Sequence, residues 1–212
     1  MTNIICKKTD FIKIISNKKF KKVLELGPGD KGYSISTDYI DYFDNSISYP
    51  GKKFHVLDLN KSNRLPFNDN EFDFVIISHV LEHLKDPFIV MDEVSRVGKS
   101  GYIELPTRFE DNILSNYSTR NKDGEYPSDP YGHKWWFEYG LGGRLVVSER
   151  LPVLARSFSL KERNYLMQFM ESNFILCVLW NDKIDWQKSK FDHKKIKLKK
   201  PFVLNEGSLF FF

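Results

Sequence analysis

The chain has 212 residues, of which 41% are hydrophobic and 28% charged, a composition typical of a globular protein with a sizeable core. Its net charge of +4 comes from local lysine-rich runs, and its two cysteines, Cys6 and Cys177, lie too far apart for a metal-ligand spacing or a disulfide framework. The sequence shows no apolar stretch long enough for a membrane span and no signal-peptide pattern, so we expect a single cytoplasmic domain over residues 1–212.

In chain order, the first predicted element is a short amphipathic helix over residues 8–18. Phe11, Ile12 and Ile15 recur there at helical spacing. Five short apolar strands follow, separated by turns and polar connections, over residues 22–26, 37–41, 53–58, 73–78 and 101–105. This alternation predicts an α/β fold with a Rossmann-like, doubly wound and mostly parallel sheet within residues 1–106.

Three local features refine this predicted sheet. The segment 73–78 is apolar throughout, which is typical of a central parallel strand buried on both faces. Asp86 and Pro87 predict the start of a helix, as N-cap and first helical residue, and Gly98 predicts its end. Only a few residues separate Gly32 from the second strand, so the helix between the first two strands is expected to be very short or absent.

The second half of the chain has a different pattern. Residues 107–132 are polar and rich in turn formers, which predicts a long loop or lid. Residues 134–139 and 144–149 flank a glycine-rich turn, which predicts a β-hairpin. We therefore expect a lid and hairpin insertion over residues 107–159, on the acceptor side, after the fifth strand. The remaining residues, 160–212, are predicted to form a helix over 160–171, a strand over 173–180 and a last strand at 208–212.

A glycine-rich turn after the first strand is the first indication of a ligand site. Gly27, Gly29 and Gly32 let the backbone turn sharply and approach a ligand, which by itself is a weak signal. The preceding strand carries Glu25, whose carboxylate would repel a pyrophosphate and attract the cationic amino-acid end of S-adenosylmethionine. This charge pattern favours S-adenosylmethionine over a dinucleotide.

Two further carboxylates are expected near Glu25. Asp41 ends the second strand and Asp58 ends the third, and open α/β sheets bind ligands at the carboxyl ends of their strands. One carboxylate suits the ribose hydroxyls of a nucleoside, a role for which Asp38 and Asp44 compete with Asp41. Asp58 suits an adenine amino group, and taken alone it is equally consistent with a turn cap.

Two stretches resemble a known family. Residues 65–87, LPFNDNEFDFVIISHVLEHLKDP, are similar to the region around strand four of class I S-adenosylmethionine-dependent methyltransferases of the type-11 (UbiE-like) group. Residues 23–29, VLELGPG, are similar to the first motif of that group. The resemblance covers residues 21–106, and it implies an enzyme that uses S-adenosyl-L-methionine and releases S-adenosyl-L-homocysteine.

The resemblance also implies which residues bind the cofactor. Glu25 and the glycines would line its methionine end, Asp41 its ribose, and Asp58 its adenine. The complete implied set is Glu25, Leu26, Gly27, Pro28, Gly29, Asp30, Asp41, Asp58, Leu59, Ser78 and His79. The chain departs from the family pattern at residues 30–31, where Asp and Lys precede the third glycine.

Candidates for the acceptor side follow or end the fifth strand. A hydroxyl acceptor benefits from a general base, for which His133 is the first choice and Glu104 the second. Three aromatic residues follow at 135–137. Their faces suit a sugar ring, a base or a methylated cation, and they equally suit a hairpin strand buried against the core.

A metal site was considered at His79, Glu82 and His83, because residues 79 and 83 lie one helical turn apart. No separate Cys/His motif supplies the further ligand that such a site needs. We therefore expect no metal, and interpret Glu82 as a helix-end or packing residue.

The leading hypothesis is a methyltransferase that acts on a small polar acceptor. The family resemblance suggests an oxygen of a sugar or sugar-linked metabolite of surface polysaccharide synthesis. The alternatives are an RNA or protein methyltransferase that uses the basic run at residues 188–200, and a non-catalytic binding module. That run has little aromatic interleaving, so a solvated face is favoured and nucleic acid is not an expected partner. A monomer and a homodimer are both consistent with the sequence.

Overall fold

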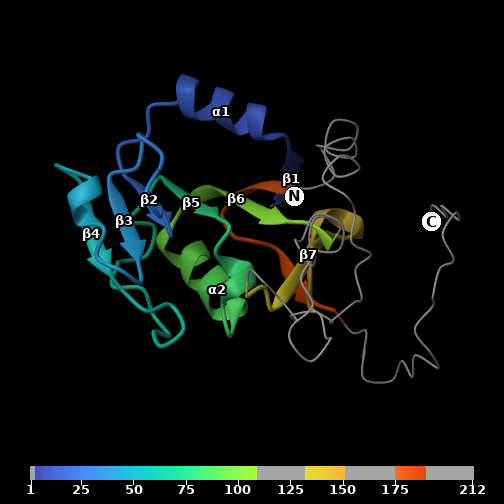
Figure 1. The fold of residues 1–212 in the computed structure, drawn as a ribbon. Coiled ribbons are helices and arrows are strands. Elements are labelled where there is room, and N and C mark those ends of the chain that lie inside the picture. Colours follow the sequence, from blue (N-terminus) through green and yellow to red (C-terminus); the bar gives the residue numbers. More distant parts are fainter. Residues whose placement is uncertain (1–2, 109–131, 151–174, 190–212) are drawn as a thin grey trace, which may run out of the picture.

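The computed structural model, which describes residues 3–108, 132–150 and 175–189, is built on a seven-stranded sheet (Figure 1). Five parallel strands form its larger part, and two antiparallel strands complete one side. In spatial order the strands are β1 (Asn3–Cys6), β9 (Ile175–Asn181), β6 (Ser100–Pro106), β5 (Phe74–Ser78), β2 (Val23–Leu26), β3 (Asp38–Asp41) and β4 (Lys53–Val56). The predicted Rossmann-like α/β sheet is confirmed.

Among the described residues, one α-helix packs on each face of this sheet. On one face α1 (Lys8–Asn17) buries Phe11, whose ring stacks on Tyr102 at a centroid distance of 3.8 Å. The other face is covered by α2 (Pro87–Val97). The central strand β5 therefore has no exposed face: Phe74 and Ile76 pack with the α1 side, and Val75 and Ile77 with the α2 side.

The bounds of α2 follow from local chemistry. The Asp86 side chain accepts hydrogen bonds from the backbone amides of Phe88 and Ile89, at 2.9 and 3.4 Å, and so satisfies two N–H groups of the first turn. Gly98 ends the helix, where an added Cβ would lie 2.4 Å from Val75 Cγ2. Both predicted ends are confirmed.

The direction of strand addition reverses between β2 and β5. From β2 the chain moves outward through β3 and β4, whereas from β5 it moves to β6 on the opposite side. Ligands of open α/β sheets bind outside the carboxyl ends of the strands at such a point. Residues 27–37, which join β2 to β3, contain no helix, as predicted, and this connection begins at the carboxyl end of the sheet with Gly27 and Gly29 beside the cavity.

Strands β9 and β1 add an antiparallel side to the parallel sheet. The strand predicted over residues 173–180 is present as β9, whereas β1 was not predicted. Their pairing places Cys6 directly opposite Cys177, and both cysteines are free thiols. The sequence does not predict this contact, because the two cysteines lie far apart in the chain.

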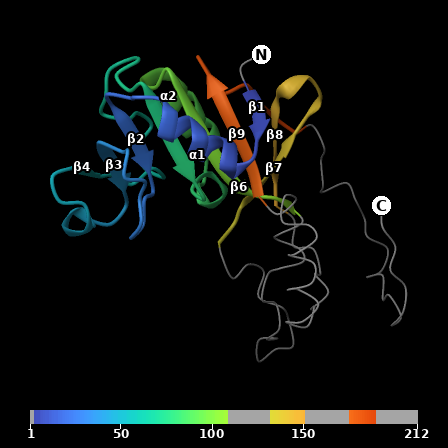
Figure 2. The same cartoon turned by 90° about the horizontal axis from the view of Figure 1, so that it is seen from above.

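A second, three-stranded sheet contains the predicted hairpin. Strands β7 (Trp135–Tyr139) and β8 (Leu145–Glu149) pair antiparallel, and β10 (Trp186–Lys188), which was not predicted, adds in parallel to β8. Figure 2 shows this hairpin beside the β1 and β9 side of the large sheet, where Tyr139 Oη donates to the backbone oxygen of Asn3 at 3.2 Å.

The aromatic run of β7 belongs to the core. Trp135, Trp136 and Phe137 are 7%, 3% and 1% exposed. The Trp135 ring lies 5.3 Å from the ring of Phe88 on α2, measured between centroids. The structure therefore favours a buried hairpin strand over an aromatic acceptor surface.

Several predicted segments lie outside the described residues. They are the main part of the lid, the helix over 160–171, the last strand at 208–212 and the basic run beyond residue 189. Within the described part of the chain, no helix combines the length and apolar character needed to cross a membrane.

Candidate functional site

A cavity of about 550 Å³ opens where the strand order reverses. Its walls come from the segments that follow β2, β3, β4 and β5. Six of the predicted cofactor residues line it: Gly27, Gly29, Asp41, Asp58, Leu59 and His79. The other five, Glu25, Leu26, Pro28, Asp30 and Ser78, are not among its lining residues.

Gly27 permits the close approach of two chain segments beside the cavity. Its φ is +64°, in the left-handed region, and its amide donates to the Ile40 carbonyl at 2.8 Å. A Cβ at this position would lie only 2.4 Å from Val80 Cγ2, on the segment that follows β5. Glycine is therefore required on two grounds, backbone conformation and space.

Glu25 has a different position from the one expected. Its side chain is buried, and Oε2 accepts hydrogen bonds from the Tyr33 amide at 2.8 Å and the Ser36 hydroxyl at 2.6 Å. Burial raises the pKa of Glu25 to about 7, although these two hydrogen bonds act to lower it. The expected contact of Glu25 with the methionine end stays a prediction, and in the structure its carboxylate binds the β2–β3 loop.

Tyr49 is a site-forming residue that the sequence analysis missed. Its hydroxyl accepts a hydrogen bond from the Gly32 amide at 2.9 Å and lies 2.8 Å from the Gly29 carbonyl oxygen, to which it can donate. It thereby joins the two ends of the turn that has no helix to support it. No pattern in the sequence marks this residue, because the contact spans two separate loops.

Asp41 and Asp58 place two carboxylates on neighbouring strand ends. Asp41 Oδ1 accepts from the Tyr42 amide at 2.6 Å, and Asp58 Oδ1 accepts from the Asn60 amide at 2.9 Å. The Asn60 hydrogen bond lowers the pKa of Asp58, so this carboxyl group is ionised at neutral pH.

The two competitors of Asp41 for the ribose role lie elsewhere. Asp38 is buried at the start of β3, where its carboxylate accepts from the Thr37 hydroxyl at 2.7 Å. Asp44 accepts from the Ser46 amide at 2.9 Å and does not line the cavity. Of the three, Asp41 alone faces the cavity.

His79 stands at the end of β5 between two carboxylates. Its Nε2 lies 3.4 Å from Glu104 Oε1, and its Nδ1 lies 3.4 Å from Glu82 Oε1. The two nearby carboxylates, that of Glu104 first and that of Glu82 second, raise the pKa of His79 to about 10. The imidazole is therefore cationic at neutral pH, and it lines the cavity.

Glu104 is less suited to general-base catalysis than expected. It also accepts from Lys8 Nζ at 2.9 Å and from the Tyr102 hydroxyl at 2.5 Å, and it borders a separate cavity of about 360 Å³. Although burial raises its pKa, hydrogen bonds from His79, Tyr102 and Lys8 bring it down to about 2. A carboxylate with so low a pKa is a weak proton acceptor. Its contacts favour the positioning of His79 instead.

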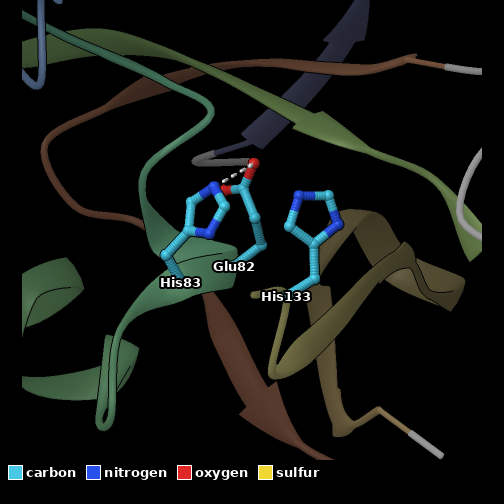
Figure 3. Close-up of side chains that lie close together, drawn as sticks. All are labelled: Glu82, His83 and His133. Atoms are coloured by element: carbon cyan, nitrogen blue, oxygen red, sulfur yellow. Dashed lines mark ion pairs between the residues drawn. The ribbon is translucent and has the colours of Figure 1, made fainter. Parts of the chain in front are cut away.

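The start of β7 is docked on the 3₁₀ turn η2 (Leu81–His83). The Lys134 amide donates to the Glu82 carbonyl at 2.6 Å, and Lys134 Nζ donates to the His83 carbonyl at 2.6 Å. These bonds bring His133 beside His83, with ring centroids 4.7 Å apart (Figure 3). His83 lines the cavity, whereas His133 is not among the lining residues and reaches it only through its contact with His83.

The docking of β7 on η2 also brings a third possible metal ligand next to Glu82 and His83. The sequence shows no further ligand near His83 and Glu82, because residue 133 lies far from both along the chain. The fold supplies one in His133: the ligand atoms of Glu82, His83 and His133 all lie within 4.8 Å of one another.

Comparison with known proteins gives a family match and structural neighbours. Residues 31–103 match the family model described as a methyltransferase domain. A protein from Pyrococcus horikoshii is 16% identical with a TM-score of 0.47, over 81% of this chain and 86% of that one. An S-adenosylmethionine dependent methyltransferase from Mesorhizobium loti is 10% identical with a TM-score of 0.43, over 81% of this chain and 97% of that one. The comparison with curated proteins found no match.

Together, the reversal of strand order and the carboxylates at neighbouring strand ends define a Rossmann-like domain with a ligand cavity at its switch point. The family match makes this assignment specific. Residues 31–103, which contain β3 to β5 and most of β6, are similar to a methyltransferase domain, and this match supports S-adenosyl-L-methionine as the ligand of the cavity.

Replacing Gly27 with alanine is expected to destabilise the protein more than replacing Gly29. Both substitutions incur the left-handed backbone penalty of roughly 1–2 kcal/mol. Only the methyl group at position 27 also collides with Val80, since no atom lies within 4 Å of a Cβ at Gly29. Urea unfolding would measure both losses, and Val80→Ala should recover part of the Gly27→Ala loss. Equal losses at the two glycines would contradict the packing argument.

Glu25→Gln is expected to stabilise the protein above pH 7. Because the pKa of Glu25 rises from 4.5 to about 7 on folding, its contribution to stability is fully present below pH 4.5 and lost as the pH rises through 7. Full loss amounts to roughly 3 kcal/mol. Glutamine cannot ionise, yet its side-chain oxygen can accept the same two hydrogen bonds.

The measurement is urea unfolding of both proteins between pH 5.5 and 8. The difference in free energy of unfolding should grow with pH in favour of Glu25→Gln. Glu25→Ala serves as the control that loses both hydrogen bonds. A difference that does not change with pH would show that Glu25 is ionised without penalty.

Proposed function

We propose that this methyltransferase acts on a small polar acceptor, an oxygen of a sugar or sugar-linked metabolite of surface polysaccharide synthesis. S-adenosyl-L-methionine, when bound, supplies an activated methyl group. The observation that supports the proposal is the docking of His133 next to His83, which lines the cofactor cavity. An oxygen acceptor needs such a group, whereas many amines need only to be positioned.

The chemistry of the residues that line the cavity supports the proposed position of the cofactor. Asp41 and Asp58 offer ionisable oxygens at neighbouring strand ends, suited to ribose hydroxyls and to an adenine amino group. Ile40, Leu57 and Leu59 form an apolar wall between them, suited to the faces of the nucleoside rings. We propose that Gly27 and Gly29 lie along the methionine part, with Glu25, Leu26, Pro28 and Asp30 shaping the turn that carries them.

The acceptor side is proposed to be the polar edge formed by His79, His83 and His133. His79 offers a fixed positive charge, held by Glu104 from behind. His133 is proposed as the group that activates the acceptor oxygen. The aromatic residues of β7 are buried, so polar side chains at this edge carry the recognition of the acceptor.

The RNA or protein alternative gains no specific support from the described residues. Most of the basic run lies outside them. Its first residue, Lys188, lies over the rings of Trp135 and Phe88, at 5.3 and 5.6 Å from their centroids. That lysine covers the aromatic core of the hairpin.

Asp41→Asn and Asp58→Asn are each expected to weaken binding of S-adenosylhomocysteine about tenfold, the loss of roughly one charge-assisted hydrogen bond. Isothermal titration of the full chain measures the affinity. Asp44→Asn is the matched control, because Asp44 follows the same strand but does not line the cavity. Unchanged affinity in both test variants would refute the proposed cofactor position.

His133→Ala is expected to lower kcat about 100-fold or more while the affinity for S-adenosylhomocysteine stays unchanged. The assay follows methyl transfer to a panel of sugars and nucleotide sugars, with His55→Ala as a histidine control on β4. Wild-type turnover would exclude a role for His133. Transfer to RNA or protein alone would overturn the proposed acceptor, and cofactor binding without any transfer would indicate a non-catalytic module.

A further inference from the structure

Three metal-ligating side chains converge beside the cofactor cavity. Glu82 and His83 come from η2, and His133 comes from the residues just before β7 (Figure 3). Their ligand atoms all lie within 4.8 Å of one another. Two imidazoles and one carboxylate are the ligand set of many zinc sites that keep an open position.

Glu82 is the feature that most needs an explanation. The residue is fully buried, and neither of its side-chain oxygens accepts a hydrogen bond from any described residue. The two nearest imidazole nitrogens are His79 Nδ1 at 3.4 Å and His83 Nε2 at 4.0 Å. His79 is shared with Glu104. Because a buried carboxylate without hydrogen bonds is costly, Glu82 has oxygens that a further ligand can use.

The backbone around these residues is fixed before any ligand arrives. Lys134 bonds the carbonyls of both Glu82 and His83, and Trp135 Nε1 donates to the Leu84 carbonyl at 2.9 Å. Gly132, with φ +72°, precedes His133 and leaves room next to His83 Nδ1. Two segments far apart in the sequence are therefore held together at the point where the three side chains meet.

We propose that Glu82, His83 and His133 bind one divalent transition-metal ion, through two imidazole nitrogens and a carboxylate oxygen. Such a ligand set suits Zn²⁺ and leaves coordination positions open. Because His83 also lines the cofactor cavity, the ion lies at the acceptor edge. This part rests on the proposed function: the ion would orient the acceptor hydroxyl and lower its pKa, so that His133 activates the acceptor through the metal.

The test uses the full chain, stripped of metal with EDTA and titrated with Zn²⁺. Calorimetry and elemental analysis should give one ion per chain. Glu82→Gln, His83→Ala and His133→Ala should each weaken binding roughly 100-fold or more, and His55→Ala should not. Circular dichroism confirms that each variant folds, and Glu82→Gln preserves shape. Binding of Co²⁺ in place of Zn²⁺ should produce a visible absorption band that is lost in the same three variants.

The outcomes separate this inference from the proposed function. Absence of stoichiometric Zn²⁺ binding, or binding that survives in all three variants, overturns the metal site. Zn²⁺ binding without methyl transfer to any sugar supports the site and overturns the proposed acceptor. Methyl transfer that continues unchanged after EDTA treatment supports the proposed acceptor and overturns the catalytic role of the ion.

Discussion

The close approach of the β2 turn to the segment after β5 is the constraint on which the functional end of this molecule depends. Gly27 adopts a left-handed backbone where a side chain would collide with Val80. β2 and β5 pair in parallel, and both Gly27 and Val80, which follow these two strands, line the cavity. Glu25 and Tyr49 then hold the rest of the turn, because no helix follows β2 to support it.

A chain of charges connects the cavity with the interior of the sheet. His79 lies between Glu104 on β6 and Glu82 on η2, and Lys8 on α1 contacts Glu104 from the far side. Buried charges are tolerated when they are paired in this way. The arrangement makes the position of His79 depend on three separate elements, and it leaves Glu82 with only a shared partner.

Much of the sheet could be predicted from the sequence, and six of the eleven predicted cofactor residues line the cavity. The apolar run at 73–78 is the central strand, and Asp41 and Asp58 do stand at neighbouring strand ends. The direction of side chains was harder to predict. Glu25 is buried and is not among the residues that line the cavity, because the pleat of a strand decides which face each residue takes. The sequence also left open whether the aromatic residues of β7 are buried or contact an acceptor. The packing of the hairpin against α2 shows that they are buried.

The sequence by itself determined the five parallel strands, the ends of α2 and the acids at strand ends. Hydrophobic period, capping residues and turn residues are local, so a short window of sequence contains them. Only the tertiary structure decided that Cys6 faces Cys177 and that His133 meets Glu82 and His83. Those contacts join segments far apart in the chain, and their geometry depends on the antiparallel β1–β9 pairing and on the hydrogen bonds that dock β7 on η2.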